Sequence, residues 1–327
     1  MKKILAVVLV VIFVTAGIPF LIISSFVSKD NTGQNIEETI ETIPVYIAEE
    51  DRVEEMNVNQ YLKEVVAAEM PAEFYPEALR AQAIAARTYL INRINAYKTS
   101  GIPEEHKGAY ICTDATHCKS WISEEKRREM WDADKADEYW QKISDAVEST
   151  GRLIVTYNDE PISAVFHSTS SGFTENAKDV WGGDVAYLVS VKSEGDDQSP
   201  RFQDEKNYTI DEFKKIAEEK IEGVNWDNYI IGDITRSDAG GIMSIDIGGV
   251  AVKGTDFRFM YDLRSTNIQI EQNENNIKIT TKGYGHGVGM SQYGANYLAS
   301  IGKNYEDILK TYYTGVKISE CESFALN

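Results

Sequence analysis

The sequence predicts an α+β protein, in which an N-terminal helix pair is followed by antiparallel strands in one large domain or two lobes. Two stretches support this prediction. Residues 57–101 (NVNQYLKEVVAAEMPAEFYPEALRAQAIAARTYLINRINAYKTSG) repeat apolar side chains at the helical period. Residues 151–168 (GRLIVTYNDEPISAVFHS) contain two strand-like runs around a polar turn, which is typical of an antiparallel pair.

Length and charge limit the possible functions. The chain has 327 residues, 43% of them hydrophobic, and is long enough to bury a large core. It contains 33 Lys and Arg against 52 Asp and Glu, which gives a formal net charge of −19. Nucleic-acid binding needs clustered basic side chains, so this charge argues against a nucleic-acid partner and against passive adhesion to an anionic membrane.

The N-terminal segment predicts a membrane anchor. Lys2 and Lys3 are followed by residues 4–27, which contain no charged side chain. A bilayer span needs about 20 such residues, and basic residues before it favour the cytoplasmic side. We therefore expect a cytoplasmic N-terminus at residues 1–3, a transmembrane signal anchor at 4–27 and an extracytoplasmic remainder. A long signal peptide that is removed is the alternative.

The next segment predicts a stalk. Residues 28–56 are acidic and lack sustained helical periodicity. They suit an extracytoplasmic linker that leads into a strand, IPVYIA, at the edge of the main domain. That domain is expected to extend over residues 57–327 and contains no internal repeat.

One carboxylate falls on the apolar face of the first predicted helix. Three aliphatic residues and this glutamate share the i, i+3, i+4, i+7 spacing of one helical face: Leu62, Val65, Val66 and Glu69. Pro71 ends the helix, so Glu69 lies in its last turn. An apolar setting disfavours the charged form of a carboxyl group, which would allow Glu69 to act as an acid. An ion pair with Arg80 or Arg87 is the alternative.

Further signals define the helix boundaries. Asn57, with Gln60 three residues later, is the expected N-cap of the first helix, and Asn59 is the alternative. Pro76 opens the second, which runs to about Lys98 and is closed by Gly101. Residues 121–149 are expected to form one more helix.

The segment HKGAYICTDATHC, residues 106–118, contains two of the four histidines and two of the three cysteines in the chain. These side chains, His106, Cys112, His117 and Cys118, are the ligand set of a tetrahedral structural Zn²⁺ site. With four protein ligands, such a site would leave no open position for a catalytic water. A Cys112–Cys118 disulfide is the alternative, since the domain is expected outside the cytoplasm.

A polar loop follows the predicted strands. Its sequence, STSSGFTEN, presents hydroxyl and amide side chains and leads to Trp181 and Tyr187. Hydroxyl and amide groups next to aromatic rings suit sugars, which present hydroxyls at the ring edge and C–H groups on the ring face. An ordinary polar loop beside a structural tryptophan is the alternative.

A glycine-rich segment, KGYGHGVGMSQYGANYLAS, lies near the C-terminus. Its glycines alternate around His286, a pattern that predicts neither an ordinary helix nor a strand. The Gly-Lys-Ser/Thr of a phosphate-binding loop is absent. Close approach of a ligand to the backbone, with His286 donating to a sugar oxygen, is one interpretation. A structural turn leading into a helix at residues 291–301 is the other.

Three motifs in this order resemble the signatures of the SpoIID/LytB family: YLKEVVAAEMPAEFYPEALRAQAIAARTYL, HSTSSGFTENAKDVWGG and GYGHGVGMSQYGA. The resemblance covers nearly all of the chain after the predicted stalk, and the histidine and cysteine loop is similar to that of clostridial members. It implies a lytic transglycosylase that cuts MurNAc–GlcNAc bonds of peptidoglycan glycan strands during endospore engulfment, preferably in strands without stem peptides. Zinc would be structural and not catalytic.

In this family the catalytic residue is the glutamate of the E-M-P motif, here Glu69. It would protonate the glycosidic oxygen and then accept the proton of the MurNAc 6-hydroxyl, which closes on C1 as a 1,6-anhydro sugar. Ordinary glycoside hydrolysis instead uses two carboxylates. The residues expected to bind the glycan are Ser170, Ser171, Trp181, Tyr187, His286 and Gln292.

The resemblance also implies partners and a location. A sporulation cell-wall amidase and a membrane anchoring protein would act with the chain, which would be a single-pass protein of the mother-cell membrane facing the forespore. The family also contains amidase enhancers, so a non-catalytic glycan-binding module that stimulates an amidase is the alternative. A zinc amidase acting on stem peptides is a further alternative, which would need three ligands and an open water position.

Overall fold

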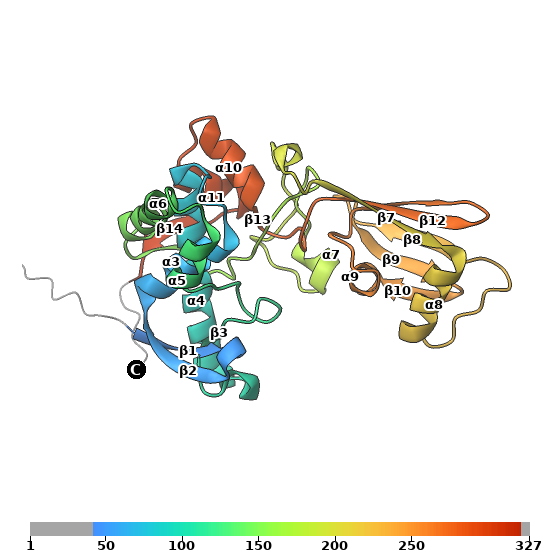
Figure 1. Cartoon of the computed structure of the whole chain (residues 1–327), viewed down its shortest axis with the longest axis horizontal. Helices are drawn as coiled ribbons and strands as arrows, with labels where there is room; N and C mark the ends of the chain where they lie inside the picture. Colours follow the sequence, from blue (N-terminus) through green and yellow to red (C-terminus); the bar gives the residue numbers. More distant parts are fainter. Residues whose placement is uncertain (1–41, 322–327) are drawn as a thin grey trace, which may run out of the picture. The chain divides into compact units, whose positions relative to one another are not determined.

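The computed structural model describes residues 42–321, which belong to one compact unit. They form an α+β fold with several antiparallel sheets, as predicted from the sequence (Figure 1). The helices of this part of the chain are α3 (Val58–Glu69), α4 (Pro76–Ser100), α5 (Glu124–Met130), α6 (Ala136–Ser149), α7 (Ala177–Trp181), α8 (Ile210–Lys220), α9 (Gly254–Met260), α10 (Gln292–Ser300) and α11 (Tyr305–Tyr312).

The strands are short and distributed over several sheets. They are β1 (Thr42–Ile47), β2 (Arg52–Asn57), β3 (Ile111–Cys112), β4 (Leu153–Tyr157), β5 (Glu160–Pro161), β6 (Phe166–His167), β7 (Gln203–Thr209), β8 (Ile231–Arg236), β9 (Ile242–Ile247), β10 (Val250–Lys253), β11 (Ile268–Gln272), β12 (Asn276–Lys282), β13 (Met290–Ser291) and β14 (Lys317–Glu320). Antiparallel pairing joins β10-β9-β8, β11-β12-β7, β14-β4-β5 and the pair β1-β2. By contrast, β3 pairs with β1 and β13 pairs with β6 in parallel.

The predicted helix pair is confirmed, together with its boundary signals. The side chain of Asn57 accepts a hydrogen bond from the backbone N–H of Gln60 at 3.1 Å, which caps α3. Helix α4 opens with Pro76, whose missing N–H would have no partner in the first turn. It ends before Gly101, which adopts a φ of 85° that favours glycine.

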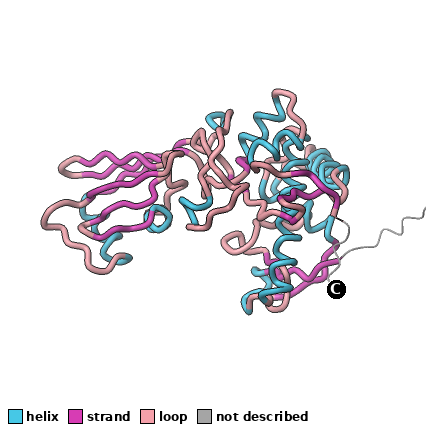
Figure 2. The backbone as a smooth tube through the Cα atoms, turned by 180° about the vertical axis from the view of Figure 1, so that it is seen from behind, coloured by secondary structure: helices cyan, strands magenta, loops and turns pink. Residues whose placement is uncertain are grey.

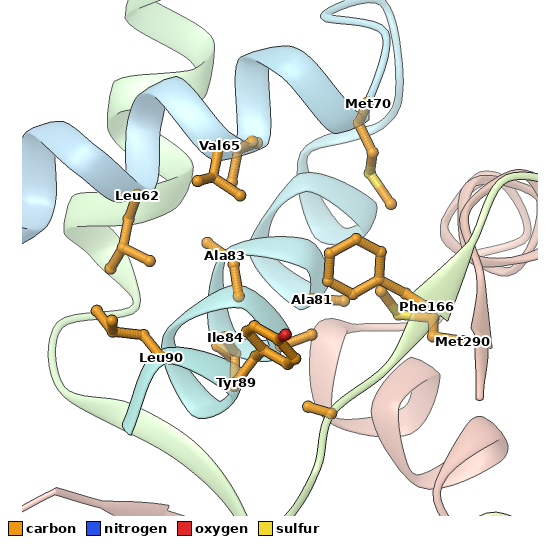
Figure 3. Packing of buried hydrophobic residues seen from close by; sticks show 14 of the residues in the cluster. Leu62, Val65, Met70, Ala81, Ala83, Ile84, Tyr89, Leu90, Phe166 and Met290 are labelled. Carbon is orange, nitrogen blue, oxygen red and sulfur yellow. The ribbon is translucent and has the colours of Figure 1, made fainter. Parts of the chain in front are cut away.

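The first hydrophobic core lies between the helices. Helices α3, α4 and α6 lie side by side (Figure 1). Figure 3 shows Leu62 and Val65 of α3 directed toward Ala83 and Leu90 of α4, where small alanine side chains allow close approach of the two backbones. Leu62 and Val65 are at most 1% exposed, and each such side chain stabilises the fold by about 1.5–3 kcal/mol.

A second core lies under the sheets β10-β9-β8 and β11-β12-β7, which form most of the long strands in Figure 2. Phe213 of α8 stacks on Tyr261 with ring centroids 4.5 Å apart and an interplanar angle of 12°. The Tyr261 hydroxyl donates to the Phe213 carbonyl oxygen at 3.0 Å, so this buried polar group is paired.

Two local predictions were wrong. The single helix predicted at residues 121–149 is interrupted between α5 and α6, where the carbonyl oxygen of Asp132 accepts N–H groups from both Lys135 and Ala136 in a turn. The second predicted strand, ISAVFHS at residues 162–168, is reduced to β6, and β5 lies in the predicted NDEP turn. Of these two short strands, β5 pairs with β4, whereas β6 aligns with β13.

The predicted location in a membrane also has to be corrected. Within residues 42–321, no helix combines the length and the apolar character that crossing a bilayer requires. The longest, α4, contains Glu77, Arg80, Arg87, Arg93 and Lys98, and the others are too short. The segment 4–27, to which the sequence analysis assigned the anchor, lies outside the described residues, as do residues 28–41 of the predicted stalk.

Candidate functional site

Glu69 is the last residue of α3 and is partly buried. The helix stops here because Met70 precedes Pro71 and adopts an extended conformation, with φ −119° and ψ 142°. One carboxylate oxygen of Glu69, Oε1, accepts the backbone N–H of Ser120 at 2.9 Å. The other, Oε2, accepts the side-chain amide of Gln292 at 3.3 Å. The carboxylate is therefore held from two distant parts of the chain.

The alternative ion pair of Glu69 with a nearby arginine is not present. Arg80 pairs with Glu77 at the start of α4. Arg87 is fully buried and donates to the carbonyl oxygens of Val147 and Leu153, both at 3.1 Å. Glu69 is thus left with neutral hydrogen-bond donors.

Gln292, which the sequence analysis placed among the glycan-binding residues, is brought to Glu69 by a short parallel pair. In this pair Met290 lies opposite Phe166 and Ser291 opposite His167. Ser291 then caps α10 by accepting the N–H of Gly294 at 3.3 Å, so Gln292 begins the helix. Only 5% of Gln292 is exposed, and its amide has little freedom to leave the carboxylate.

A second carboxylate of α3 fixes the segment that contains Ser120. Glu64 accepts the indole N–H of Trp121 at 2.8 Å and the backbone N–H of Glu124 at 3.1 Å. Glu64 is 5% exposed, and burial raises the pKa of its carboxyl group although these hydrogen bonds oppose the rise. Glu64 and Glu69 together position residues 120–124 against α3.

Lys119 lies next to Ser120 and was missed by the sequence analysis. It is 9% exposed, and its Nζ lies 3.9 Å from the ring centroid of Phe166 and 4.4 Å from that of Tyr89. Burial lowers the pKa of its ammonium group to about 8, against the opposing effect of the negative charge of Glu69. Its place directly after the last predicted metal ligand was the one signal in the sequence.

The four residues predicted to bind metal do come together. His106, Cys112, His117 and Cys118 each offer a ligand atom, and these atoms all lie within 4.8 Å of one another. Cys118 Sγ is 3.5 Å from His106 Nε2, and Cys112 Sγ is 3.7 Å from His117 Nδ1. Sulfur and nitrogen ligands of a tetrahedral zinc ion are about 3.5 Å apart, so the residues fit such an ion.

The surroundings of this cluster also suit a metal. The Nδ1 of the buried His106 lies 3.1 Å from the carbonyl oxygen of Ala109, which orients Nε2 toward the cysteines. A hydrogen bond from Cys118 lowers the pKa of the Cys112 thiol to about 5, and metals bind the thiolate form. Both cysteines are free, so the alternative disulfide is not formed.

The predicted glycan residues His286 and Trp181 lie against each other, with ring centroids 5.1 Å apart. His286 Nδ1 accepts the backbone N–H of Val288 at 3.1 Å, so in the neutral ring the proton is on Nε2. Burial, together with the positive charges of groups such as Lys119, holds the pKa of His286 well below its usual range. His286 is therefore a neutral hydrogen-bond donor within the electrostatic range of the Lys119 charge.

The glycine-rich segment around His286 packs on the chain itself. A β-carbon at Gly289, where φ is 73°, would lie 2.2 Å from the carbonyl oxygen of Val165. One at Gly285, where φ is 118°, would lie 2.7 Å from the side chain of His167. At these positions the glycines allow contact between the segment and β6, which is the structural interpretation.

Ser170 and Ser171 form hydrogen bonds within the fold and also line a small pocket together with His286. Ser170 is 1% exposed, and its backbone N–H donates to Asp196 at 2.8 Å. Ser171 accepts the side-chain amide of Asn267 at 3.1 Å. Asp196, which the sequence analysis missed, also accepts the hydroxyl of Ser291, the cap of α10. This network ties the polar loop to the helix that begins with Gln292.

Tyr187 is likewise used within the fold. Its hydroxyl accepts the backbone N–H of Ser163 at 3.0 Å, and its ring packs against Tyr157 with centroids 5.5 Å apart. Trp181 differs from Tyr187 because 51% of its side chain is exposed. Of the two aromatic candidates, only Trp181 presents a free ring surface.

A pocket of about 300 Å³ lies beside Trp181. It is lined by the buried carboxylate of Glu175, by the exposed Lys178 and Lys253, and by Met243, which is 40% exposed. Mixed charges and an exposed indole ring can bind a polar ligand that also has an apolar face. Trp181 joins this pocket to His286.

The chain is similar in sequence to several known proteins. The sequence profile of the family described as stage II sporulation protein matches residues 46–157. The chain is 40% identical over 290 residues to stage II sporulation protein D of Bacillus amyloliquefaciens, covering 88% of this chain and 82% of that protein. It is 40% identical over 284 residues to the Bacillus subtilis (strain 168) protein of the same name, covering 86% and 80%. It is also 26% identical over 310 residues to an amidase enhancer of Bacillus subtilis (strain 168), covering 79% of this chain and 40% of that protein.

Proposed function

Because the chain belongs to the stage II sporulation protein D family, we propose that it is a lytic transglycosylase of peptidoglycan. It cuts the MurNAc–GlcNAc bonds of glycan strands, preferably strands without stem peptides, and leaves 1,6-anhydroMurNAc ends. The family acts in sporulation, and the proposed step belongs to engulfment of the forespore.

The observation that supports this proposal best is the setting of Glu69. Its carboxylate is partly buried at the end of α3 and has a separate donor on each oxygen, Ser120 N–H and the Gln292 amide. A lytic transglycosylase needs one carboxyl that first donates a proton and then accepts one. Two fixed donors keep that carboxyl in one orientation during both steps.

The two donors suit the two protonation states differently. A backbone N–H can only donate, so Oε1 remains an acceptor and the acidic proton is on Oε2. The Gln292 amide can present its NH₂ group to the carboxylate or its oxygen to the protonated acid. Glu69 gives the proton to the glycosidic oxygen as the C1–O bond breaks. It then takes the proton of the MurNAc 6-hydroxyl as that oxygen bonds to C1.

Trp181, His286 and the pocket beside them are the proposed glycan-binding surface. The exposed indole ring would stack on the face of a sugar, as aromatic rings do with apolar C–H groups. The neutral His286 has its proton on Nε2, which also interacts with the backbone of Phe166, so a sugar oxygen would share this donor. Ser170 and Ser171, which line a small pocket with His286, and Tyr187 are the further residues proposed for this surface.

Zinc is the proposed ion of the histidine and cysteine cluster. Bound by four side chains, it would supply a cross-link and no open position for a catalytic water. The last of these ligands, Cys118, is two residues before Ser120, so the cluster fixes the segment that contacts Glu69. A cell-wall amidase that removes stem peptides is the proposed functional partner, with a membrane anchoring protein at the same wall.

A direct test uses the full chain, as wild type and as Glu69→Gln, on amidase-treated peptidoglycan. We expect 1,6-anhydro ends from the wild type and a rate lower by at least about 10³-fold from the variant, which cannot exchange a proton. Mass spectrometry of the released fragments measures both. Glu64→Gln is the matched control, because Glu64 is also on α3 but has a positioning role.

A second candidate function is favoured by the similarity to an amidase enhancer. Such a module would bind glycan and stimulate an amidase without cutting the strand. Its stimulation should survive Glu69→Gln, whereas a lytic transglycosylase should lose its activity. Anhydro ends that form equally with the wild type and with Glu69→Gln, or with neither of them, would count against the proposed catalytic role of Glu69.

A further inference from the structure

Lys119 places an unpaired ammonium group inside the fold. The residue is 91% buried, as its exposed fraction is 9%, and Nζ contacts the ring faces of Phe166 and Tyr89. Within residues 42–321 it forms no ion pair and no hydrogen bond with an acceptor. The side chain is largely buried, but Nζ is not among the fully enclosed polar atoms of the described chain, so its three N–H donors are open to an acceptor from outside. The fold therefore keeps a cation whose partner is not part of the described chain.

This cation belongs to the immediate surroundings of Glu69. Ser120, its neighbour in the chain, donates to Glu69 Oε1 at 2.9 Å. Phe166, the ring beneath it, is in β6 and lies opposite Met290, two residues before Gln292, the donor to Oε2. The charge of Lys119 also acts on His286. Lys119 is thus the sequence neighbour of a residue that contacts the proposed acid, and its charge acts on the proposed glycan-binding histidine.

The proposed substrate can have an anionic group on the same sugar ring that reacts. MurNAc has a lactyl ether on C3, in the ring whose C1 reacts. In a strand with stem peptides, the lactyl carboxyl is part of an amide bond and has no charge. After an amidase has removed the peptide, it is a free carboxylate. A buried ammonium group binds a carboxylate through strong charge-assisted hydrogen bonds.

We propose that Lys119 is a specificity-determining residue and that its ammonium group binds the free lactyl carboxylate of the reacting MurNAc. This inference rests on the proposed lytic transglycosylase function and explains how the site selects strands without stem peptides. The bound carboxylate would supply the hydrogen-bond acceptors that Lys119 does not have within residues 42–321. With an amide in its place, the cation remains without a counter-charge.

A structural role makes a different prediction. If Lys119 served only to pack between Phe166 and Tyr89, its replacement would lower stability and affect all substrates alike. Arg93 also lies over the ring of Tyr89, with its guanidinium carbon 5.0 Å from the ring centroid. It is not adjacent in sequence to a residue that contacts Glu69, and it serves as a control cation.

The test compares two soluble glycan oligomers that differ only at the lactyl group, a free acid and its primary amide. The full chain is assayed as wild type, Lys119→Met, Lys119→Arg and Arg93→Met, and anhydro ends are counted. We expect the wild type to prefer the acid by about 10- to 100-fold, the effect of one charge-assisted hydrogen bond. Lys119→Met should lose this preference through slower cleavage of the acid. Lys119→Arg and Arg93→Met should retain most of it.

Each other result overturns the inference. It fails if the wild type has no preference for the acid, or if Lys119→Met slows cleavage of both oligomers equally. It fails too if Lys119→Met leaves the preference intact. Thermal unfolding of each variant identifies a loss of folding. If Lys119→Met does not fold, the inference is tested by the ratio of acid to amide cleavage rates, compared between the wild type and Lys119→Arg.

Measurements of oligomer binding test the role of Lys119 separately from the proposed lytic transglycosylase function. If the wild type releases no anhydro ends from either oligomer, the lytic transglycosylase function fails. Calorimetric affinities for the acid and the amide, measured on the Glu69→Gln chain with and without Lys119→Met, then test Lys119 alone. A preference for the acid that depends on Lys119 supports the inference, and equal affinities refute it.

Discussion

Replacing His167 with asparagine tests how the fold keeps a histidine uncharged beside β13. His167 is 4% exposed, and its Nδ1 donates to the carbonyl oxygen of Val288 at 3.2 Å. Its Nε2 has no hydrogen-bond partner, so a proton there would create a buried, unpaired charge. Burial accordingly lowers the pKa of His167 from 6.5 to about 4. Asparagine can retain a donor near the Nδ1 position and removes the titrating ring.

The sign and size of the effect follow from these two pKa values. Between pH 6.5 and about pH 4 the unfolded chain binds the proton at His167 and the folded chain does not. The free energy of unfolding therefore falls as the pH is lowered through this window. At about 1.4 kcal/mol per unit, His167 contributes a loss of about 2 kcal/mol at pH 5 and about 3 kcal/mol at pH 4.

Urea unfolding of the wild type and His167→Asn at several pH values between about 7 and about 4.5 measures this contribution. Other groups titrate in both proteins alike, so their effects cancel in the difference between the two curves. We expect the wild type to lose about 2 kcal/mol more than the variant between pH 7 and pH 5. Parallel curves would refute the assignment of His167 as a neutral, buried histidine.

Four further predictions concern the site. Gln292→Ala should reduce turnover by about 10- to 100-fold with little change in thermal unfolding, because it removes one donor to Glu69. Glu64→Gln should lower the free energy of unfolding in urea by about 1–3 kcal/mol and leave most of the turnover, because the acceptors of Trp121 and Glu124 are weakened. Cys112→Ser should reduce bound zinc, melting temperature and turnover together, as measured by metal analysis and calorimetry. Trp181→Ala should raise KM by about 10-fold without changing the melting temperature, since the ring is half exposed.

The helical part of the fold was predictable because its signals are local. Spacing along one helix placed Glu69 with Leu62 and Val65, and those two aliphatic residues are buried as expected. Caps and proline positions fixed the ends of α3 and α4. The histidine and cysteine cluster was also visible because all four residues lie within one short segment. Such features depend on neighbours in the sequence, which one sequence displays directly.

The partners of Glu69 depend on distant segments. Ser120 is 51 residues away in the chain and Gln292 is 223 residues away. No periodicity relates these positions, and the pairing of β6 with β13 that delivers Gln292 is two residues long. The resemblance to a family suggested Gln292, whereas Lys119 and Asp196 had no such support. For Ser170 and Ser171 the sequence could not show the internal hydrogen bonds, because a hydroxyl-rich loop has the same sequence pattern whether its groups face a ligand or an internal carboxylate.

The position of the histidine and cysteine cluster in the chain links it to Glu69, the proposed acid. Cys118, Lys119 and Ser120 are consecutive, so one end of a cross-linked loop is continuous with a donor to Glu69 and with the buried ammonium group. An ion bound at the cluster would affect the reaction without taking part in it. By holding Cys118, it would limit the positions of Lys119 and Ser120. Glu64 fixes the same segment from its other side, through Trp121 and Glu124. Loosening the attachment at Cys118 should therefore lower the rate through misplacement of Ser120, even where the fold survives.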